Sequence, residues 1–301
     1  AGESGVGKSR LGDEIRTMAL VKGATVVRGQ AVSEGRSPYQ IWRAILRWLG
    51  LAGDLDPVEA GLVKLLVPDV VTLPEYDLNA ANALEPQKAQ SRLLNALVNT
   101  LKNSGQTVVI QLEDLHWANR ESITLLASLA DYVADLPILI MASFRDDERP
   151  NLPHTLPQMP LMKLQRLSEA HIAELSTAML GENGARPQVI DLLQRETEGN
   201  VFFLIEVVRA LAAEAGNLDQ IGLMTLPQQV FAGGIQLIVK RRLENLPEWT
   251  HPLLNLAAVI GRQLDLDLMQ DIMPDADFTN WLVECSNAAV LEVQDAKWRF
   301  A

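Results

Sequence analysis

The chain has 301 residues, of which 48% are hydrophobic and 21% charged, so it is long enough for two or three domains and too apolar to be disordered. Its formal net charge of -12 disfavours nucleic acid and anionic lipid except at a local basic cluster. A single cysteine, Cys285, excludes an internal disulfide and favours a cytoplasmic protein. No apolar run is long enough to predict a membrane span.

The first half alternates β-branched runs with amphipathic helical segments, which predicts a parallel sheet covered by helices. Strands are expected at residues 24–27, 107–112 and 137–143, with a short one at 162–164, and helices around residues 11–18, 41–49, 93–101 and 125–129. The run at 137–143 is almost wholly apolar, so this strand should be buried on both faces. Residues 50–90 are expected to form an insertion or cap.

The second half is predicted to be helical after a proline-rich linker at residues 146–160. Helices are expected at residues 171–180, 189–195, 201–213, 252–260, 266–272 and 278–289, followed by strands near 291–293 and 298–300. Three helices and a hairpin form a winged-helix pattern. We therefore expect an α/β core over 1–150, which the motifs below identify as a P-loop ATPase core, a helical lid or linker domain over 151–234 and a truncated winged-helix-like domain over 235–301.

A phosphate-binding motif opens the chain, because residues 2–9 fit G-x-x-x-x-G-K-[ST] at every constrained position. Glycines let the backbone curl around phosphates, and the helix that follows directs its positive end at the same anion. Lys8 would contact the β- and γ-phosphates, and the Ser9 hydroxyl would bind Mg²⁺. The predicted nucleotide-binding residues are Gly2, Glu3, Ser4, Gly5, Val6, Gly7, Lys8, Ser9 and Arg10.

The strand that should lead into this loop is missing, because only Ala1 precedes Gly2. The loop should therefore be held poorly. The chain also begins without Met and inside a motif, which predicts a piece of a longer protein.

Two carboxylates, Glu113 and Asp114, follow the apolar strand at 107–112. Phosphoryl-transfer sites use such carboxylates to hold Mg²⁺ and to polarise an attacking water. Gln111 interrupts the apolar run and weakens the match. The next strand leads to Arg145, which would lie near the γ-phosphate or, in the other interpretation, form a surface ion pair.

Four segments together resemble the AAA-type ATPase module of STAND signalling ATPases, which occurs beside adenylate or guanylate cyclase, Ser/Thr kinase and LuxR-type regulator domains. They are residues 2–11, 112–119, 143–148 and 197–203. The resemblance implies a P-loop α/β fold in which Glu113 holds magnesium, and Asp114 activates water. Arg145 matches the polar exit of the family's fourth strand. Two positions depart from the family: Val201 replaces a common Pro, and Asn119 replaces an Asp.

The resemblance implies an ATP-binding, slowly ATP-hydrolysing switch that uses ATP/ADP and Mg²⁺, with Lys8, Asp114 and Arg145 as catalytic residues. Self-association on activation and covalently linked effector and sensor domains are also implied. A DNA-associated AAA+ ATPase with a winged helix is the alternative, although acidic residues outnumber basic ones beyond residue 235 and make DNA binding unlikely. A non-hydrolysing, nucleotide-bound scaffold is a further alternative.

Overall fold

The structure is a computed structural model that describes residues 1–33, 37–70, 75–215, 240, 242–244, 246–261, 264–294 and 297–300. The chain divides into two compact units. The first unit comprises Ala1–Leu167 and Asn200–Phe202, and the second comprises Ser168–Gly199 and Phe203–Ala301. The first unit thus continues beyond residue 150, where the sequence places the end of the ATPase core. The expected boundary at residues 234 and 235 lies outside the described residues.

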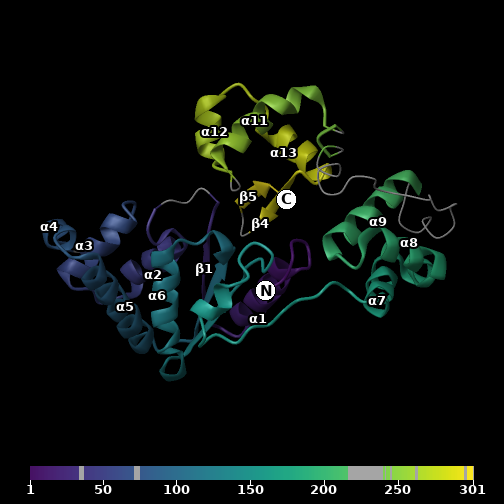
Figure 1. Ribbon diagram of the computed structural model, residues 1–301. Coiled ribbons are helices and arrows are strands. Elements are labelled where there is room, and N and C mark those ends of the chain that lie inside the picture. Colours follow the sequence, from purple (N-terminus) through teal and green to yellow (C-terminus); the bar gives the residue numbers. More distant parts are fainter. Residues whose placement is uncertain are drawn as a thin grey trace. The chain divides into compact units, whose positions relative to one another are not determined.

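The first unit is built on a parallel sheet of three strands in the order β1-β2-β3 (Figure 1). The strands are β1 (Thr25–Gln30), β2 (Val108–Glu113) and β3 (Ile138–Ala142). Every residue of the central strand β2 is buried, as expected for a parallel strand covered on both faces. The mixed α/β fold predicted from the sequence is confirmed.

Strand β3 is less buried than the sequence predicts. Leu139 is 48% exposed, and the other residues of the strand are only partly buried. Among the described residues, β3 pairs with β2 alone and is an edge strand, so the predicted burial on both faces is wrong. An apolar groove of about 470 Å³ runs beside β3, lined by Leu11 and Ile15, by β3 itself and by residues 158–162.

The expected strand at 162–164 is not formed within the part of the chain that the structure describes. Instead, Ala1 makes both hydrogen bonds of a parallel bridge with this segment. The amino group of Ala1 donates to the Met162 carbonyl at 2.7 Å, and the Leu164 N–H donates to the Ala1 carbonyl at 2.8 Å. The start of the chain is therefore fixed beside the groove.

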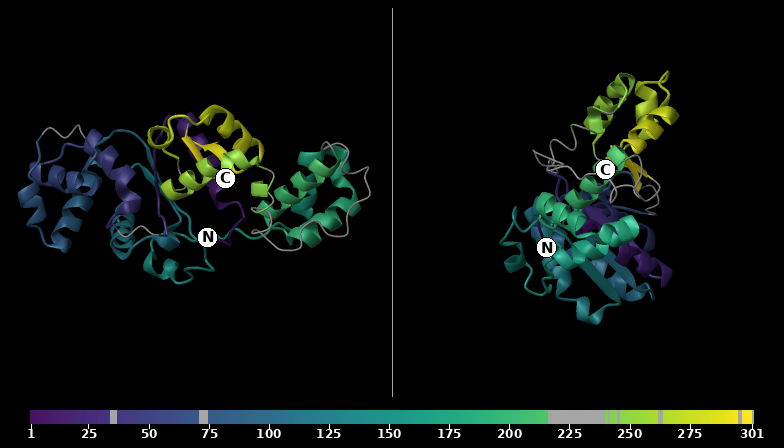
Figure 2. Two further views of the ribbon diagram at one scale, coloured as in Figure 1. Left: turned by 90° about the horizontal axis from the view of Figure 1, so that it is seen from above. Right: turned by 90° about the vertical axis from the view of Figure 1, so that its right-hand side faces the viewer.

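Helices cover both faces of the sheet. They are α1 (Lys8–Val21), α2 (Arg43–Ala52), α3 (Pro57–Leu66), α4 (Leu78–Asn82), α5 (Pro86–Asn103) and α6 (Arg120–Ala130), with short 3₁₀ turns η1 (Gln40–Trp42), η2 (Leu115–Trp117), η3 (Val133–Asp135) and η4 (Leu152–Thr155). Helix α1 packs on β1 and β2. The α3–α4 pair lies at the end of this unit farthest from α1 (Figures 1 and 2).

The core of the first unit lies between the sheet and helices α2, α5 and α6. Trp42, Ile45 and Leu97 are fully buried there, and the Trp42 indole donates to the Ser122 carbonyl at 3.1 Å. Residues 50–90, expected to be an insertion or cap, form part of this core through α3, which begins with a capping box at Asp56. The proline-rich segment 146–160 also packs here through Leu152.

The second unit is helical with a terminal hairpin, as the sequence predicts. Its elements are α7 (Glu169–Leu180), η5 (Gly181–Ala185), α8 (Pro187–Thr197), α9 (Val201–Ala215), η7 (Glu248–Thr250), α11 (His251–Ile260), α12 (Leu266–Ile272), α13 (Phe278–Asn287), and the antiparallel strands β4 (Leu291–Gln294) and β5 (Lys297–Phe300). Trp281 and Cys285 are fully buried in the core around α11–α13. No helix among the described residues combines the length and apolarity that a bilayer span needs.

Candidate nucleotide-binding site

The loop at residues 2–7 leads directly into α1, whose first helical residue is Lys8. Gly5 and Gly7 have φ values of 83° and 98°, in the left-handed region that favours glycine. Gly7 occupies the N-cap position and supplies no side-chain cap. The first-turn N–H groups of α1 are therefore not capped by a side chain, and such helix ends bind anions.

Asn200 holds this loop from a distant part of the chain. Its side-chain amide donates to the Ser4 carbonyl at 2.9 Å, and the Phe202 N–H donates to the Gly5 carbonyl at 3.0 Å. A side chain at Gly5 would lie 2.4 Å from the Asn200 Oδ1 atom. Asn200 is not among the site residues predicted from the sequence, although the Gly-Asn pair at 199 and 200 is the signal that could have indicated it.

Lys8 folds back over the loop. Its Nζ atom donates to the carbonyls of Gly2 and Glu3 at 2.7 and 2.6 Å. Burial is the main cause that lowers the pKa of Lys8; the positive charge of Arg145 adds to it, and the carboxylates Asp114, Asp146 and Asp147 oppose it. Because phosphate oxygens are acceptors like these carbonyls, the uncapped helix end and Lys8 fit a bound phosphate.

The other residues predicted to bind the nucleotide differ in burial and in side-chain contacts. Val6 is buried, and Glu3 accepts two hydrogen bonds from Arg166 at 3.0 and 2.9 Å. Ser9 is exposed at the start of α1. Arg10 is exposed as well and pairs with Glu14 one turn along the helix.

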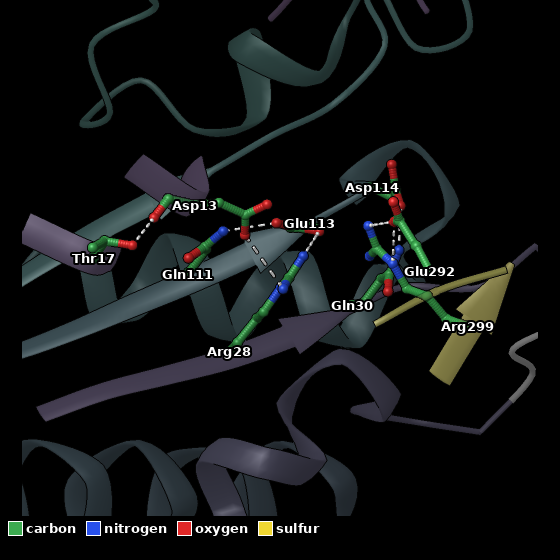
Figure 3. A network of polar contacts seen from close by, with 9 residues as sticks. All are labelled: Asp13, Thr17, Arg28, Gln30, Gln111, Glu113, Asp114, Glu292 and Arg299. Carbon is green, nitrogen blue, oxygen red and sulfur yellow. Dashed lines mark hydrogen bonds and ion pairs between the residues drawn. The ribbon is translucent and has the colours of Figure 1, made fainter. Parts of the chain in front are cut away.

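The two carboxylates at the end of β2 have different surroundings (Figure 3). Glu113 is 4% exposed, and its two oxygens accept from Gln111 Nε2 at 2.7 Å and from Arg28 Nη2 at 2.6 Å. Asp114 is partly exposed, has a φ of 57° and accepts from Gln30 Nε2 at 2.8 Å. The backbone thus turns sharply between the two carboxylates.

Arg145, after β3, forms an ion pair with Glu148 at 2.5 Å, and its guanidinium lies 5.7 Å from the Trp117 ring centroid. Its backbone N–H donates to Nδ1 of His116 at 3.4 Å. Burial is the main cause that lowers the pKa of His116, against the nearby carboxylates of Glu148 and Asp114. These contacts give His116 a role in positioning the turn that carries Arg145.

Asn119 caps α6. Its side chain accepts from the Ser122 N–H at 3.0 Å and donates to the Ser37 carbonyl at 2.8 Å. Among the described residues, no group of three or more His, Cys, Asp or Glu side chains could hold a metal ion.

Residues 1–141 match the family model of the AAA ATPase domain. The matched segment contains the loop, β1, β2 and most of β3. The match supports an AAA-type ATPase module in the first unit.

An uncharacterized protein of Rhizobium meliloti (strain 1021) is 24% identical to the chain over 299 residues, covering 91% of this chain and 28% of the relative. The chain thus spans less than a third of that relative. Two structures of RuvB from Thermotoga maritima, one described as a Holliday junction branch migration motor, overlay with TM-scores of 0.30 at 12% and 11% identity. Each overlay covers 98% of this chain, with 90% and 92% of the RuvB chains. A TM-score of 0.30 does not establish a common fold.

Proposed function

We propose that this chain is an ATP-binding and slowly ATP-hydrolysing signal-transduction switch of the STAND type. The observation that carries the proposal is the glycine loop that leads into the uncapped start of α1, with Lys8 folded over it. The match of residues 1–141 to the AAA ATPase domain supports the same activity.

In this proposal the loop residues 2–10 bind the ATP or ADP phosphates, and Lys8 exchanges its bonds to the loop carbonyls for phosphate oxygens. Ser9 and one carboxylate at the acidic end of β2 would hold Mg²⁺, which when bound neutralises phosphate charge and polarises the γ-phosphoryl group. The family resemblance assigns the metal to Glu113 and the activation of water to Asp114. Arg145 would leave Glu148 to stabilise negative charge on the phosphates.

The proposed switch element is the junction between α8 and α9. Glu198 and Gly199 both have positive φ values, 47° and 80°, and the next residue, Asn200, contacts the phosphate-binding loop. Helix α9 begins at Val201, so a change in the loop would pass to α9 through the chain itself. Effector and sensor domains of a longer protein, and self-association on activation, complete the proposal.

A DNA-associated AAA+ ATPase is the second candidate, and the charges of the second unit disfavour it. Among its described residues from Lys240 onward, basic side chains are few, and three of them are paired: Lys240 with Glu244, Arg242 with Glu206 and Arg299 with Glu292. Arg241 and Arg262 lie outside the described residues. DNA binding that weakens steeply with salt would favour this candidate.

The test is calorimetric binding of ATP and ADP with Mg²⁺, followed by phosphate release under excess ATP. Lys8→Ala should abolish binding, whereas Lys22→Ala, at the other end of α1, is the matched control and should bind like the wild type. Equal affinities of the two variants would refute the assigned site. Tight ATP binding without phosphate release would instead support a non-hydrolysing scaffold.

A further inference from the structure

Glu113 is part of a polar network on the α1 side of the sheet (Figure 3). Gln111 and Arg28 each donate to one of its carboxylate oxygens. Arg28 also lies 3.6 Å from the Asp13 carboxylate of α1. The side chains of Glu113 and Arg28 are only 5% and 17% exposed, so this ion pair is largely shielded from water.

The residues of this network come from strands β1 and β2 and from helix α1. Gln111 and Glu113 alternate on β2 and therefore point to the same face, and Arg28 on β1 is in register with Gln111. Helix α1 covers that face, and Gly12 leaves room there: a Cβ atom at Gly12 would lie 2.7 Å from the Gln111 amide nitrogen. The glutamine that interrupts the apolar run thus has a defined partner.

These contacts do not fit Glu113 as a ligand of Mg²⁺. A magnesium ligand must offer carboxylate lone pairs, and both Glu113 oxygens already accept strong hydrogen bonds. The Arg28 guanidinium, 2.6 Å from one oxygen, would also repel a cation at that position. Releasing Glu113 would leave Arg28 without this charge partner in a shielded site.

Asp114 is in a different position at the same strand end. It is partly exposed, and one of its oxygens accepts from Gln30 Nε2 at 2.8 Å. Its left-handed backbone conformation carries it off the face that α1 covers.

We infer that Arg28 and Gln111 are positioning residues that hold Glu113 as a structural carboxylate, and that Asp114 is the carboxylate that supports Mg²⁺-dependent nucleotide binding. The inference rests on the proposed function and narrows its metal site to Ser9 and Asp114. It would also account for the slow hydrolysis that we propose, because a carboxylate that holds the metal would not serve as the base that activates water.

The test compares ADP affinity in Mg²⁺ with ADP affinity in EDTA, by calorimetry, for the wild type and for Glu113→Gln and Asp114→Asn. The ratio of the two affinities measures the metal's contribution without any turnover. Glu113→Gln should keep the wild-type ratio within about twofold, whereas Asp114→Asn should lower it by about tenfold or more. Loss of the ratio in Glu113→Gln with retention in Asp114→Asn would overturn the inference, as would equal losses in both.

Stability measurements test the positioning role separately. Arg28→Met and Glu113→Gln should each lower the unfolding temperature, and the double variant should lose less than the sum of the two, because both single variants break the same Arg28–Glu113 ion pair. Additive losses would refute the network. If Glu113→Gln alone fails to fold, the double variant serves for the ADP measurement, with the same expected ratio.

The two measurements also separate this inference from the proposed function. A wild-type chain that binds neither ATP nor ADP would refute the proposed function and, with it, the role of Asp114. The stability cycle would still decide whether Arg28 holds Glu113.

Discussion

Substituting Gly12 by alanine tests the contact between α1 and β2 directly. Gly12 is a buried residue inside a 14-residue helix, where alanine ordinarily stabilises a helix by about 1 kcal/mol relative to glycine. Here the new methyl group would lie 2.7 Å from Gln111 Nε2 and 3.8 Å from Glu113 Oε1. The Gln111 amide would have to move away from Glu113.

The size of the effect follows from what Glu113 loses. A buried acceptor that loses its donor costs roughly 1–3 kcal/mol, so the helix gain of about 1 kcal/mol is cancelled or outweighed. In a Gln111→Ala background the methyl group meets no amide, and Gly12→Ala should then stabilise by about 1 kcal/mol. The expected coupling between the two positions is therefore about 1–3 kcal/mol.

Urea unfolding of the wild type, the two single variants and the double variant measures this coupling. Met18→Ala, at a position on α1 that is 58% exposed, is the control and should have the same effect with and without Gln111. If Gly12→Ala stabilises both backgrounds equally, the Gln111 amide does not lie against α1 and the described network is incorrect.

Three further outcomes are expected. Burial raises the pKa of Cys285 to about 11, so alkylation of the folded protein at pH 8, followed by mass spectrometry, should be far slower than alkylation in urea. The free energy of unfolding should also fall as the pH rises from about 9 to 11, because over this range the thiol loses its proton in the unfolded chain but keeps it in the folded one. Asn200→Ala should weaken ADP binding about 5- to 10-fold, since the Ser4 carbonyl loses its donor; unchanged affinity in calorimetry would contradict the loop contact. Asp56→Ala should cost about 1 kcal/mol in urea unfolding through loss of the α3 capping box. A Glu85→Ala variant should cost little, because Glu85 makes no capping hydrogen bond at the start of α5 and its ion pair with Lys88 is exposed.

Local patterns predicted the strands and helices well because they depend on neighbours in the sequence. The apolar run that became β2 and the glycines before Lys8 are signals of this kind. The exposure of Leu139 could not be predicted in this way, since a run of apolar residues does not say whether a second strand will lie beside it.

The finer features of the site depend on contacts between distant segments. Asn200 and Ser4 are hydrogen-bonded although 196 positions separate them in the sequence, and no local sequence pattern indicates such a contact. Glu113 and Asp114 are adjacent and chemically alike, yet the sheet buries one beside Arg28 and the backbone turns the other away. From the sequence alone, Gln111 is unfavourable in a buried strand. In the structure Gly12 leaves room for its amide, which donates to Glu113.

The groove beside β3 has a practical consequence for work with this protein. Unpaired strand edges accept further strands, and the groove beside β3 is lined by apolar side chains and by Ala1, which is hydrogen-bonded to Met162 and Leu164. A short peptide of alternating apolar residues could therefore insert by complementation and carry a fluorescent label. Because Ala1 and Lys8, on either side of the phosphate-binding loop, both line this groove, the fluorescence of the bound peptide would report changes in the loop without any substitution in the loop itself.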